Sequence, residues 1–268
     1  MSENSNGGSS VTLSKANIVF VRAHCVGETN LLLNPMTPEV LEGLRTKKPQ
    51  PKDTESAVVQ VCARKLYVDE DGNMGIPTDN LFSAMVLAGR EVKLGGGKTK
   101  VSTATGSKLP GFCNIVGQSL LFTNRRKGTG MVSVSKGGRD FEHEGKGTVS
   151  WIADSRRGVM ASGANSIAVN ISRPRITEWE FDVILRINLS VESVTQQVIA
   201  DVLQAAGRTS GLGDYRPSKK GTYGIFTVES WEKVRESDVE AHTSECEMRI
   251  GLDVIETTKP DEEVERKP

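Results

Sequence analysis

The segment from Gly207 to Gly221, with the sequence GRTSGLGDYRPSKKG, combines residue types that can hold phosphate groups. It contains four glycines and four basic residues against one acid. Glycine lets backbone N–H groups turn toward a ligand, and lysine and arginine supply the positive charge that attracts phosphate oxygens. One glycine, Gly207, is explained as the cap of a preceding helix. The remaining pattern predicts a phosphate-binding loop, with the candidates Arg208, Gly211, Gly213, Tyr215, Arg216, Lys219 and Lys220.

Two tyrosines, Tyr215 and Tyr223, flank this loop, and a nucleobase could stack on either ring. Packing in a core or a turn explains them equally well. The loop does not fit a dinucleotide site, because a GxGxxG sequence follows a strand and opens a helix. Here the loop follows a predicted helix and opens a predicted strand. The P-loop sequence GxxxxGK[ST] is absent from the chain.

Residues for nucleophilic catalysis do not form a recognisable set. The three histidines are far apart in the sequence, and neither GxSxG nor HExxH occurs. The four cysteines are scattered without a CxxC pair, which favours reduced, buried thiols over a zinc site. These residues are His24, His143, His242, Cys25, Cys62, Cys113 and Cys246.

Four acidic residues lie close together in the sequence and could bind a divalent ion, namely Asp69, Glu70, Asp71 and Asp79. The first three belong to a predicted hairpin turn, and a solvated turn explains them more simply. The ligand spacing of an EF-hand also fails beyond Asn73. We therefore expect no catalytic residue, no metal and no cofactor. A metal-dependent nuclease is the weakest of the alternatives considered.

Charge is divided unevenly along the chain, although 34 basic and 34 acidic residues cancel overall. Between Arg90 and Arg139 ten basic residues stand against one acid, whereas residues 236–268 hold eleven acids against four basic residues. Such asymmetry is typical of polyanion contact in one part and of self-masking or partner contact in another. A merely solvated loop is the alternative. The further candidates are Lys93, Lys98, Lys100, Arg125, Arg126 and Lys127.

Hydrophobic periodicity and turn residues predict the elements that must position these loops. The expected order is a strand, a short helix begun by Pro38, a segment of helical spacing, a hairpin, a helix capped by Thr78 or Asp79, a strand, a helix and a strand. A stretch of glycine-punctuated loops and hairpins at 95–163 interrupts the series. The ranges are 16–25, 39–44, 54–63, 65–77, 80–90, 178–189, 191–206 and 223–231.

This order indicates an α+β fold whose skeleton approximates a β-α-β-β-α-β ferredoxin-like core, interrupted by a large, basic, glycine-rich insertion. We expect one domain over residues 16–235, with its core at 16–90 and 176–235 and the insertion at 91–175. A flexible tail, residues 1–15, precedes it. An acidic segment, residues 236–268, follows it.

Four stretches of the chain resemble a group of uncharacterised phage and prophage proteins: LLLNP, IPTDNLFSAMVLAG, AAGRTSGLGDYRP and YGIFTVESW. The glycine-rich loop is similar to that of the repeat-associated (RAMP-type) backbone subunits of CRISPR effector complexes. That resemblance implies a modified RNA-recognition-motif core with an inserted thumb, and polymerisation along single-stranded RNA. It also implies that the loop from Arg208 to Gly221 touches the nucleic-acid backbone, and that the basic insertion between Lys93 and Arg139 is the thumb or web.

The expected function is therefore non-enzymatic binding of single-stranded nucleic acid, RNA rather than DNA. The expected partners are the strand itself and either further copies of the chain or a larger ribonucleoprotein or viral assembly. The chain has no apolar run long enough for a membrane span and opens without a secretory signal, which predicts a cytoplasmic location in a bacterium or a phage-infected host. A viral structural or assembly protein is the principal alternative.

Overall fold

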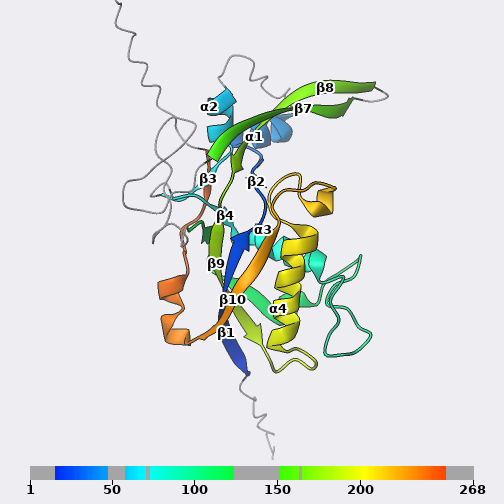
Figure 1. The fold of residues 1–268 in the computed structure, drawn as a ribbon, viewed down its shortest axis with the longest axis vertical. Coiled ribbons are helices and arrows are strands. Elements are labelled where there is room, and N and C mark those ends of the chain that lie inside the picture. The colour runs from blue at the N-terminus through cyan, green and yellow to red at the C-terminus, as the bar shows by residue number, and fades with distance from the viewer. Residues whose placement is uncertain (1–15, 48–57, 71–72, 124–150, 163–164, 252–268) are drawn as a thin grey trace, which may run out of the picture.

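The structure is a computed structural model of the chain (Figure 1). It describes residues 16–47, 58–70, 73–123, 151–162 and 165–251. The predicted tail at 1–15, most of the basic stretch beyond Thr123 and the end of the acidic segment lie outside these ranges. The described chain is a mixed α+β structure with antiparallel sheets.

The largest sheet has four antiparallel strands in the order β10-β1-β9-β5. Their bounds are β1 Ile18–Gly27, β5 Cys113–Val116, β9 Glu180–Asn188 and β10 Phe226–Val234. The strands alternate as expected, because every second side chain of β9, from Phe181 to Ile187, is buried on one face. The predictions of strands at 16–25, 178–189 and 223–231 are confirmed with shifted ends.

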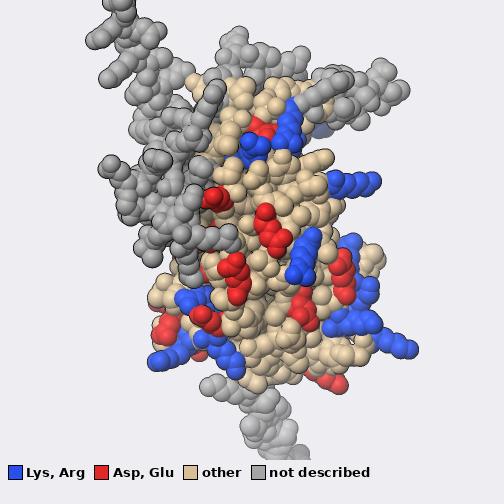
Figure 2. Space-filling model, viewed as in Figure 1, with Lys and Arg blue, Asp and Glu red and all other residues tan. Residues whose placement is uncertain are grey.

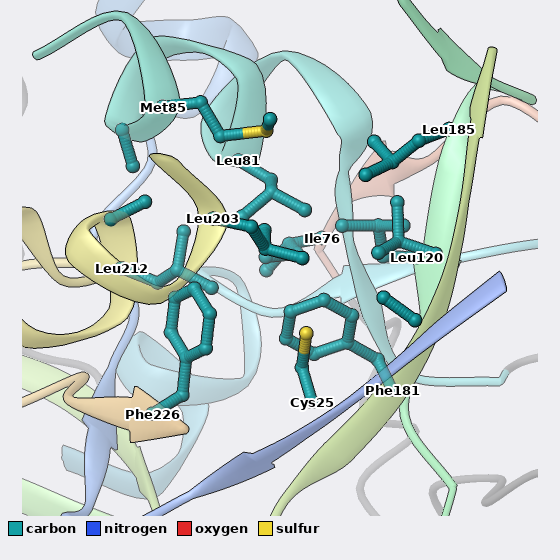
Figure 3. Packing of buried hydrophobic residues seen from close by; sticks show 14 of the residues in the cluster. Cys25, Ile76, Leu81, Met85, Leu120, Phe181, Leu185, Leu203, Leu212 and Phe226 are labelled. Carbon is teal, nitrogen blue, oxygen red and sulfur yellow. The ribbon is translucent and has the colours of Figure 1, made fainter. Parts of the chain in front are cut away.

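Two helices cover that face of the sheet, α3 (Thr78–Ala88) and α4 (Gln196–Ala205) (Figure 1). Helix α3 buries residues three and four apart, and α4 begins where the Thr195 hydroxyl accepts a hydrogen bond from the Val198 N–H at 3.2 Å. Figure 3 shows the hydrophobic core between these helices and the strands, with Cys25 and Phe181 facing the helices.

A second group of elements lies beyond one end of the main sheet (Figure 1). Strands β7 (Trp151–Ser162) and β8 (Asn165–Ile176) form a long antiparallel hairpin, and the short strand β2 (Leu31–Leu32) pairs with β8. The helices of this group are α1 (Pro38–Thr46) and α2 (Val58–Ala63). Helix α1 begins at Pro38, as the sequence predicted.

The chain after β10 crosses from one edge of the main sheet to the other. It leaves the edge strand β10, forms two single turns at Glu236–Asp238 and Glu240–His242, and then Ser244 accepts a backbone hydrogen bond from Gln118 beside β5. It ends on β11 (Arg249–Ile250), which pairs with β3 (Tyr67–Val68). We call residues 235–251 the C-terminal strap. Ile184 lies on the face of the sheet opposite the helices yet is 1% exposed, because the strap covers that side.

Several predictions about local structure were wrong. Neither Thr78 nor Asp79 caps α3, since Pro77 occupies the cap position and the Thr78 hydroxyl donates to the Gly117 carbonyl at 3.3 Å. The predicted hairpin at 65–77 is reduced to one bridge between Val68 and Met74. Strand β3 pairs instead with β11, and β4 (Gly75–Pro77) pairs with β6 (Ser119–Leu121).

Candidate nucleic-acid interface

The glycine-rich loop starts as a continuation of α4. A π-helical turn, Ala206–Ser210, follows the helix and ends at Gly211, whose φ of 68° belongs to the left-handed region. Gly207 therefore does not cap α4, contrary to the prediction. It is a glycine because a Cβ there would overlap the Phe226 carbonyl of β10.

The middle of the loop is anchored to the rest of the protein. Leu212 is 1% exposed and points into the core (Figure 3). Gly213 has a φ of 70° and lies so close to β2 that a Cβ would overlap the Leu32 carbonyl. That same carbonyl accepts a hydrogen bond from the Asp214 N–H at 2.7 Å. These contacts fix the middle of the loop against β2 and the core.

The backbone amides that the sequence suggested for phosphate binding are largely used inside the protein. The Gly211 N–H donates to the Ala206 carbonyl at 2.8 Å, and the Gly221 N–H donates to the Arg216 carbonyl at 3.0 Å. The N–H groups of Lys219 and Lys220 also close short turns. Contacts to phosphate from this loop must therefore come mainly from side chains.

The basic side chains of the loop differ in how firmly they are held. Arg216 donates from its Nη1 to the Gly213 carbonyl at 2.5 Å and from its Nε to the Ser218 hydroxyl at 3.0 Å. Arg208, Lys219 and Lys220 are exposed. Arg216 therefore shapes the loop, and the other three cations face solvent.

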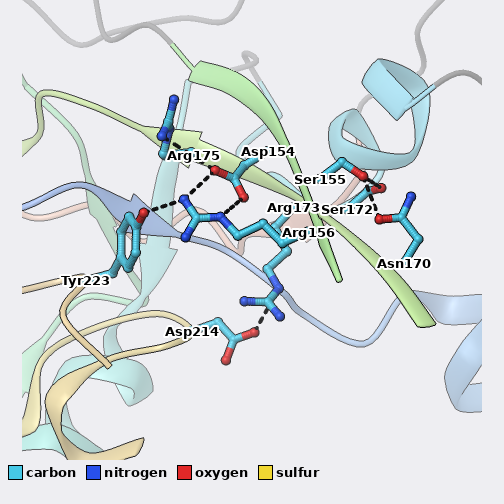
Figure 4. Close-up of polar contacts among 9 residues, drawn as sticks. All are labelled: Asp154, Ser155, Arg156, Asn170, Ser172, Arg173, Arg175, Asp214 and Tyr223. Carbon is cyan, nitrogen blue, oxygen red and sulfur yellow. Dashed lines mark hydrogen bonds and ion pairs between the residues drawn. The ribbon is translucent and has the colours of Figure 1, made fainter. Parts of the chain in front are cut away.

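A set of arginines that the sequence analysis missed faces this loop from the hairpin of β7 and β8. Side chains two apart on a strand share a face, and so do cross-strand partners. Because Asp154 pairs with Arg173 in the register, Arg156 and Arg175 lie on the same face as these two. Figure 4 shows these arginines on the side of the loop, and Ser155, Asn170 and Ser172 on the other side. The sequence did indicate this set in one respect: Arg173 and Arg175 are two residues apart, as residues on the same face of a strand are.

Two carboxylates order the three guanidinium groups. Asp154 accepts hydrogen bonds from Arg156 at 2.6 and 2.8 Å, and its Oδ2 lies 3.5 Å from Nη1 of Arg175. Asp214 of the loop lies 3.3 Å from Nε of Arg173. The hydrogen bonds that Arg156 donates to Asp154 and to the Tyr223 hydroxyl raise the pKa of its guanidinium, which is a permanent cation. Three positive groups against two negative ones leave a net positive charge.

Aromatic rings continue this surface. The Arg156 guanidinium carbon lies 5.2 Å from the centre of the Tyr223 ring, within the range of a cation–π contact. The ring centres of Tyr223 and Tyr215 are 6.0 Å apart, and Tyr215 is 45% exposed. We call the combined surface the loop–hairpin surface, formed by Arg156, Arg173, Arg175, Arg208, Tyr215, Arg216, Lys219, Lys220 and Tyr223.

The other predicted basic residues lie elsewhere. Lys93, Lys98 and Lys100 are exposed on a loop that touches Ser193, just before α4, whereas the loop–hairpin surface lies after α4. The ten-residue helix separates the two sites by about 15 Å. Figure 2 shows acidic and basic side chains interspersed on the visible face rather than gathered in one patch. Arg125, Arg126 and Lys127 lie outside the described residues.

Of the acidic residues of the predicted hairpin turn, Glu70 is exposed as expected, Asp71 lies outside the described residues, and Asp69 is not solvated. Asp69 is 3% exposed, and both of its carboxylate oxygens accept hydrogen bonds from Asn73, at 2.7 and 2.8 Å. Across the described ranges, no three histidine, cysteine or acidic side chains are grouped as metal ligands. In the same ranges, no helix has the length and apolar character needed to cross a bilayer.

Comparisons with solved structures give a distant likeness, whereas the other comparisons give no match. No family model matches the chain, and no curated protein matches it. Among solved structures, a chain of "Cryo-EM structure of the Type III-B Cmr-beta bound to cognate target RNA" is similar, with a TM-score of 0.41 and 14% identity. The likeness covers 81% of this chain and 61% of that chain. At this TM-score the fold must be established from the chain's own geometry.

Proposed function

We propose that the chain binds single-stranded nucleic acid, in the first instance RNA, on the loop–hairpin surface, and that it does so without catalysing a reaction. The observation that carries this proposal is the meeting of Arg156, Arg173 and Arg175 with the glycine-rich loop. Guanidinium groups match phosphate oxygens in geometry, and exposed tyrosine can stack on a base. Arginine and tyrosine side by side therefore serve both parts of a nucleotide.

We further propose that the main sheet and helices α3 and α4 form a ferredoxin-like core. In a β-α-β-β-α-β ferredoxin-like core, the sheet order places the last strand beside the first and the third strand between the first and second. The observed order fits if β1, β5, β9 and β10 are these four strands and α3 and α4 are the two helices. The second strand then lies at 113–116, inside the range expected to be an insertion. The loop–hairpin surface falls at the connection between the second helix and the last strand.

Salt dependence tests the proposal. For single strands, log affinity falls with log salt by about 0.7 per neutralised phosphate. We expect labelled RNA to bind at low salt in fluorescence anisotropy. An Arg208→Ala/Lys219→Ala variant should have a slope about 1.4 units shallower if both side chains contact phosphates. The matched control is Lys93→Ala/Lys100→Ala, which removes the same charge beyond the other end of α4.

Two results would contradict the proposal. Absence of binding to RNA and to DNA at low salt would remove the function. Equal slopes for the Arg208/Lys219 variant and the wild type would remove the loop from the site. If the salt slope became shallower only in the control variant, the binding site would instead be assigned to the basic loop before α4.

A second candidate, assembly into a viral particle, has one specific observation in its favour. Met36, Leu41 and Leu44 on and before α1 are 56, 49 and 55% exposed. Apolar side chains grouped in this way are typical of protein contact surfaces. Light scattering on nuclease-treated protein separates the two functions. Particles that persist without nucleic acid and dissociate in a Leu41→Glu/Leu44→Glu variant would favour assembly, whereas oligomers formed only on added RNA would favour polymerisation along a strand.

A further inference from the structure

A pocket of about 340 Å³ opens beside the glycine-rich loop. One wall is the loop from Gly211 to Asp214, and another is the segment Leu33–Pro35 that follows β2. Tyr67 of β3 and the first turns of α3, through Asn80 and Ser83, complete it. The volume lies at the lower end of the range of ligand pockets. It suits one small ring system rather than a large cofactor.

The polar groups in the pocket suit a nucleobase better than a phosphate. Asn34 Nδ2 donates to Asp214 Oδ2 at 3.2 Å, so a carboxylate stands at the wall and opposes a bound anion. Asn34 and Asn80 carry amides, which offer a donor and an acceptor side by side, as base edges do. Burial raises the pKa of Tyr67, while a hydrogen bond with Asn80 lowers it to a smaller extent. The ring of Tyr67 therefore stays neutral and forms a flat, partly apolar wall.

The pocket also lies where a strand on the loop–hairpin surface could reach it. Arg216 and Asp214 line the pocket and belong to the loop. Asp214 is in addition the ion-pair partner of Arg173 on the hairpin, at 3.3 Å. Asn34, which donates to the same Asp214 carboxylate at 3.2 Å, also lines the pocket. Phosphate site and base-sized pocket are thus adjacent parts of one surface.

We infer that this pocket receives a single unstacked nucleobase of the bound strand, held against Tyr67 and hydrogen-bonded by the amides of Asn34 and Asn80. The inference rests on the proposed function for the strand itself. Ser83 lines the pocket from α3 and is exposed, so a larger side chain at this position would fill part of the space.

The test compares Ser83→Leu, which fills the pocket, with Ser83→Ala, which removes the hydroxyl and leaves the space. Both substitutions suit a helix, so the fold is retained. Anisotropy is measured with a short RNA strand and with the same sugar–phosphate strand lacking its bases. We expect the wild type to prefer the strand with bases, and Ser83→Leu to lose about tenfold of that preference, the value of one stacked base, while stacking on Tyr215 remains. Ser83→Ala should keep the full preference, and all three should bind the abasic strand equally.

A second measurement separates this inference from the proposed function. Equilibrium dialysis with nucleoside monophosphates needs no strand, and we expect binding that Ser83→Leu abolishes. If a monophosphate binds but no strand does, the pocket is supported as a base site and the proposed function is wrong. If the wild type shows no preference for bases, or Ser83→Leu retains it in full, the pocket is not a base site even though the strand binds. A strand that binds, with no saturable monophosphate binding and no effect of Ser83→Leu, also overturns it.

Discussion

Arg208 and Arg216 carry the same charge in the same loop, yet their side chains have different roles. Arg216 holds the loop through the Gly213 carbonyl and the Ser218 hydroxyl, whereas Arg208 is exposed on the π-helical turn. We expect Arg216→Ala to lower both RNA affinity and the free energy of unfolding, the latter by about 1–2 kcal/mol for the lost charged hydrogen bonds. Arg208→Ala should lower affinity and change stability by less than about 0.5 kcal/mol.

Urea unfolding and anisotropy on the two variants check this difference. Arg208→Lys and Arg216→Lys add a further distinction, since lysine keeps the charge but cannot donate to two acceptors in a fixed fork. Lysine should restore stability only in part at 216, where alanine lowers it, and should restore affinity more at 208 than at 216. Equal destabilisation by the two alanine variants would show that Arg216 does not support the loop.

Thiol reactivity provides a test of the core at the same scale. Burial raises the pKa of Cys62 to about 11 and that of Cys113 to about 12, and burial followed by the nearby Asp182 charge raises the pKa of Cys25 still further. Cys246 is partly exposed. Because the thiolate is the reactive form, iodoacetamide at about pH 8 should modify Cys246 first, and the other three only after urea unfolding. Mass spectrometry of the peptides measures this. Rapid labelling of Cys113 in the folded protein would contradict the packing described.

At the scale of elements, two glycines on different loops, Gly96 before α4 and Gly213 after it, are required for different reasons. Gly213 and Gly96 both have positive φ, 70° and 75°, but only at Gly213 would a Cβ overlap a neighbouring backbone, the Leu32 carbonyl. Around Gly96 there is open space within 4 Å. Gly96→Ala should cost about 1 kcal/mol for the left-handed backbone. Gly213→Ala should cost at least twice that, because the loop must also separate from β2. Chemical unfolding of both variants decides, and equal losses would refute the tight contact.

The elements that could be predicted from the sequence are those with a strong local pattern. Alternation in EFDVILRIN and helical spacing in TDNLFSAMVLA are visible without a structure, because one face of each is buried. Strands β5 and β6 fall inside the stretch that the sequence predicted only as glycine-punctuated loops and hairpins at 95–163. Gly117, with a φ of 87°, turns the chain between them and sends β6 to pair with β4.

The candidate site could be predicted only in part. The glycine-rich loop was visible as a local cluster, but Arg173 and Arg175 stand 34 and 32 residues before its start at Gly207, in a segment whose Pro174 argues against a central strand. The structure explains that proline. Pro174 lies just past the two residues of β8 that pair with β2, and its carbonyl still accepts a hydrogen bond from the Leu33 N–H at 3.1 Å, so the proline ring removes only a donor at the end of this pairing. Long-range pairing of this kind has no local signal.

At the scale of the whole molecule, the strap changes which surfaces are available. A four-stranded RNA-recognition motif stacks bases on aromatic side chains of its open sheet face. Here the strap covers that face, and Arg22 on it is engaged by Glu232 at 2.5 Å and lies 3.5 Å from Nδ1 of His242. The loop–hairpin surface, at the connection between α4 and β10, is on the edge of the sheet instead. Nucleic acid should therefore approach this end of the molecule rather than the sheet face.

The acidic end of the chain starts near that surface. The strap returns to β3, where the Gly251 N–H donates to the Leu66 carbonyl at 2.9 Å, one residue from Tyr67 of the pocket. Residues 252–268 contain six acids and three basic residues, a net charge of −3. Gly251, to which these residues are joined, lies beside the pocket, so we expect their net negative charge to repel a polyanion that approaches it.

Removal of residues 252–268 should therefore strengthen RNA binding at low salt. We expect an increase on the order of fivefold, equivalent to about 1 kcal/mol of Coulomb energy, which fades as salt shortens the Debye length to about 10 Å at 0.1 M and below that at higher salt. The matched control removes residues 2–15, a similar length in which Glu3 and Lys15 cancel. Anisotropy across a salt series compares the two truncations. If both change affinity equally, the effect comes from length and not from charge. If neither changes affinity, the acidic segment serves a partner other than this surface.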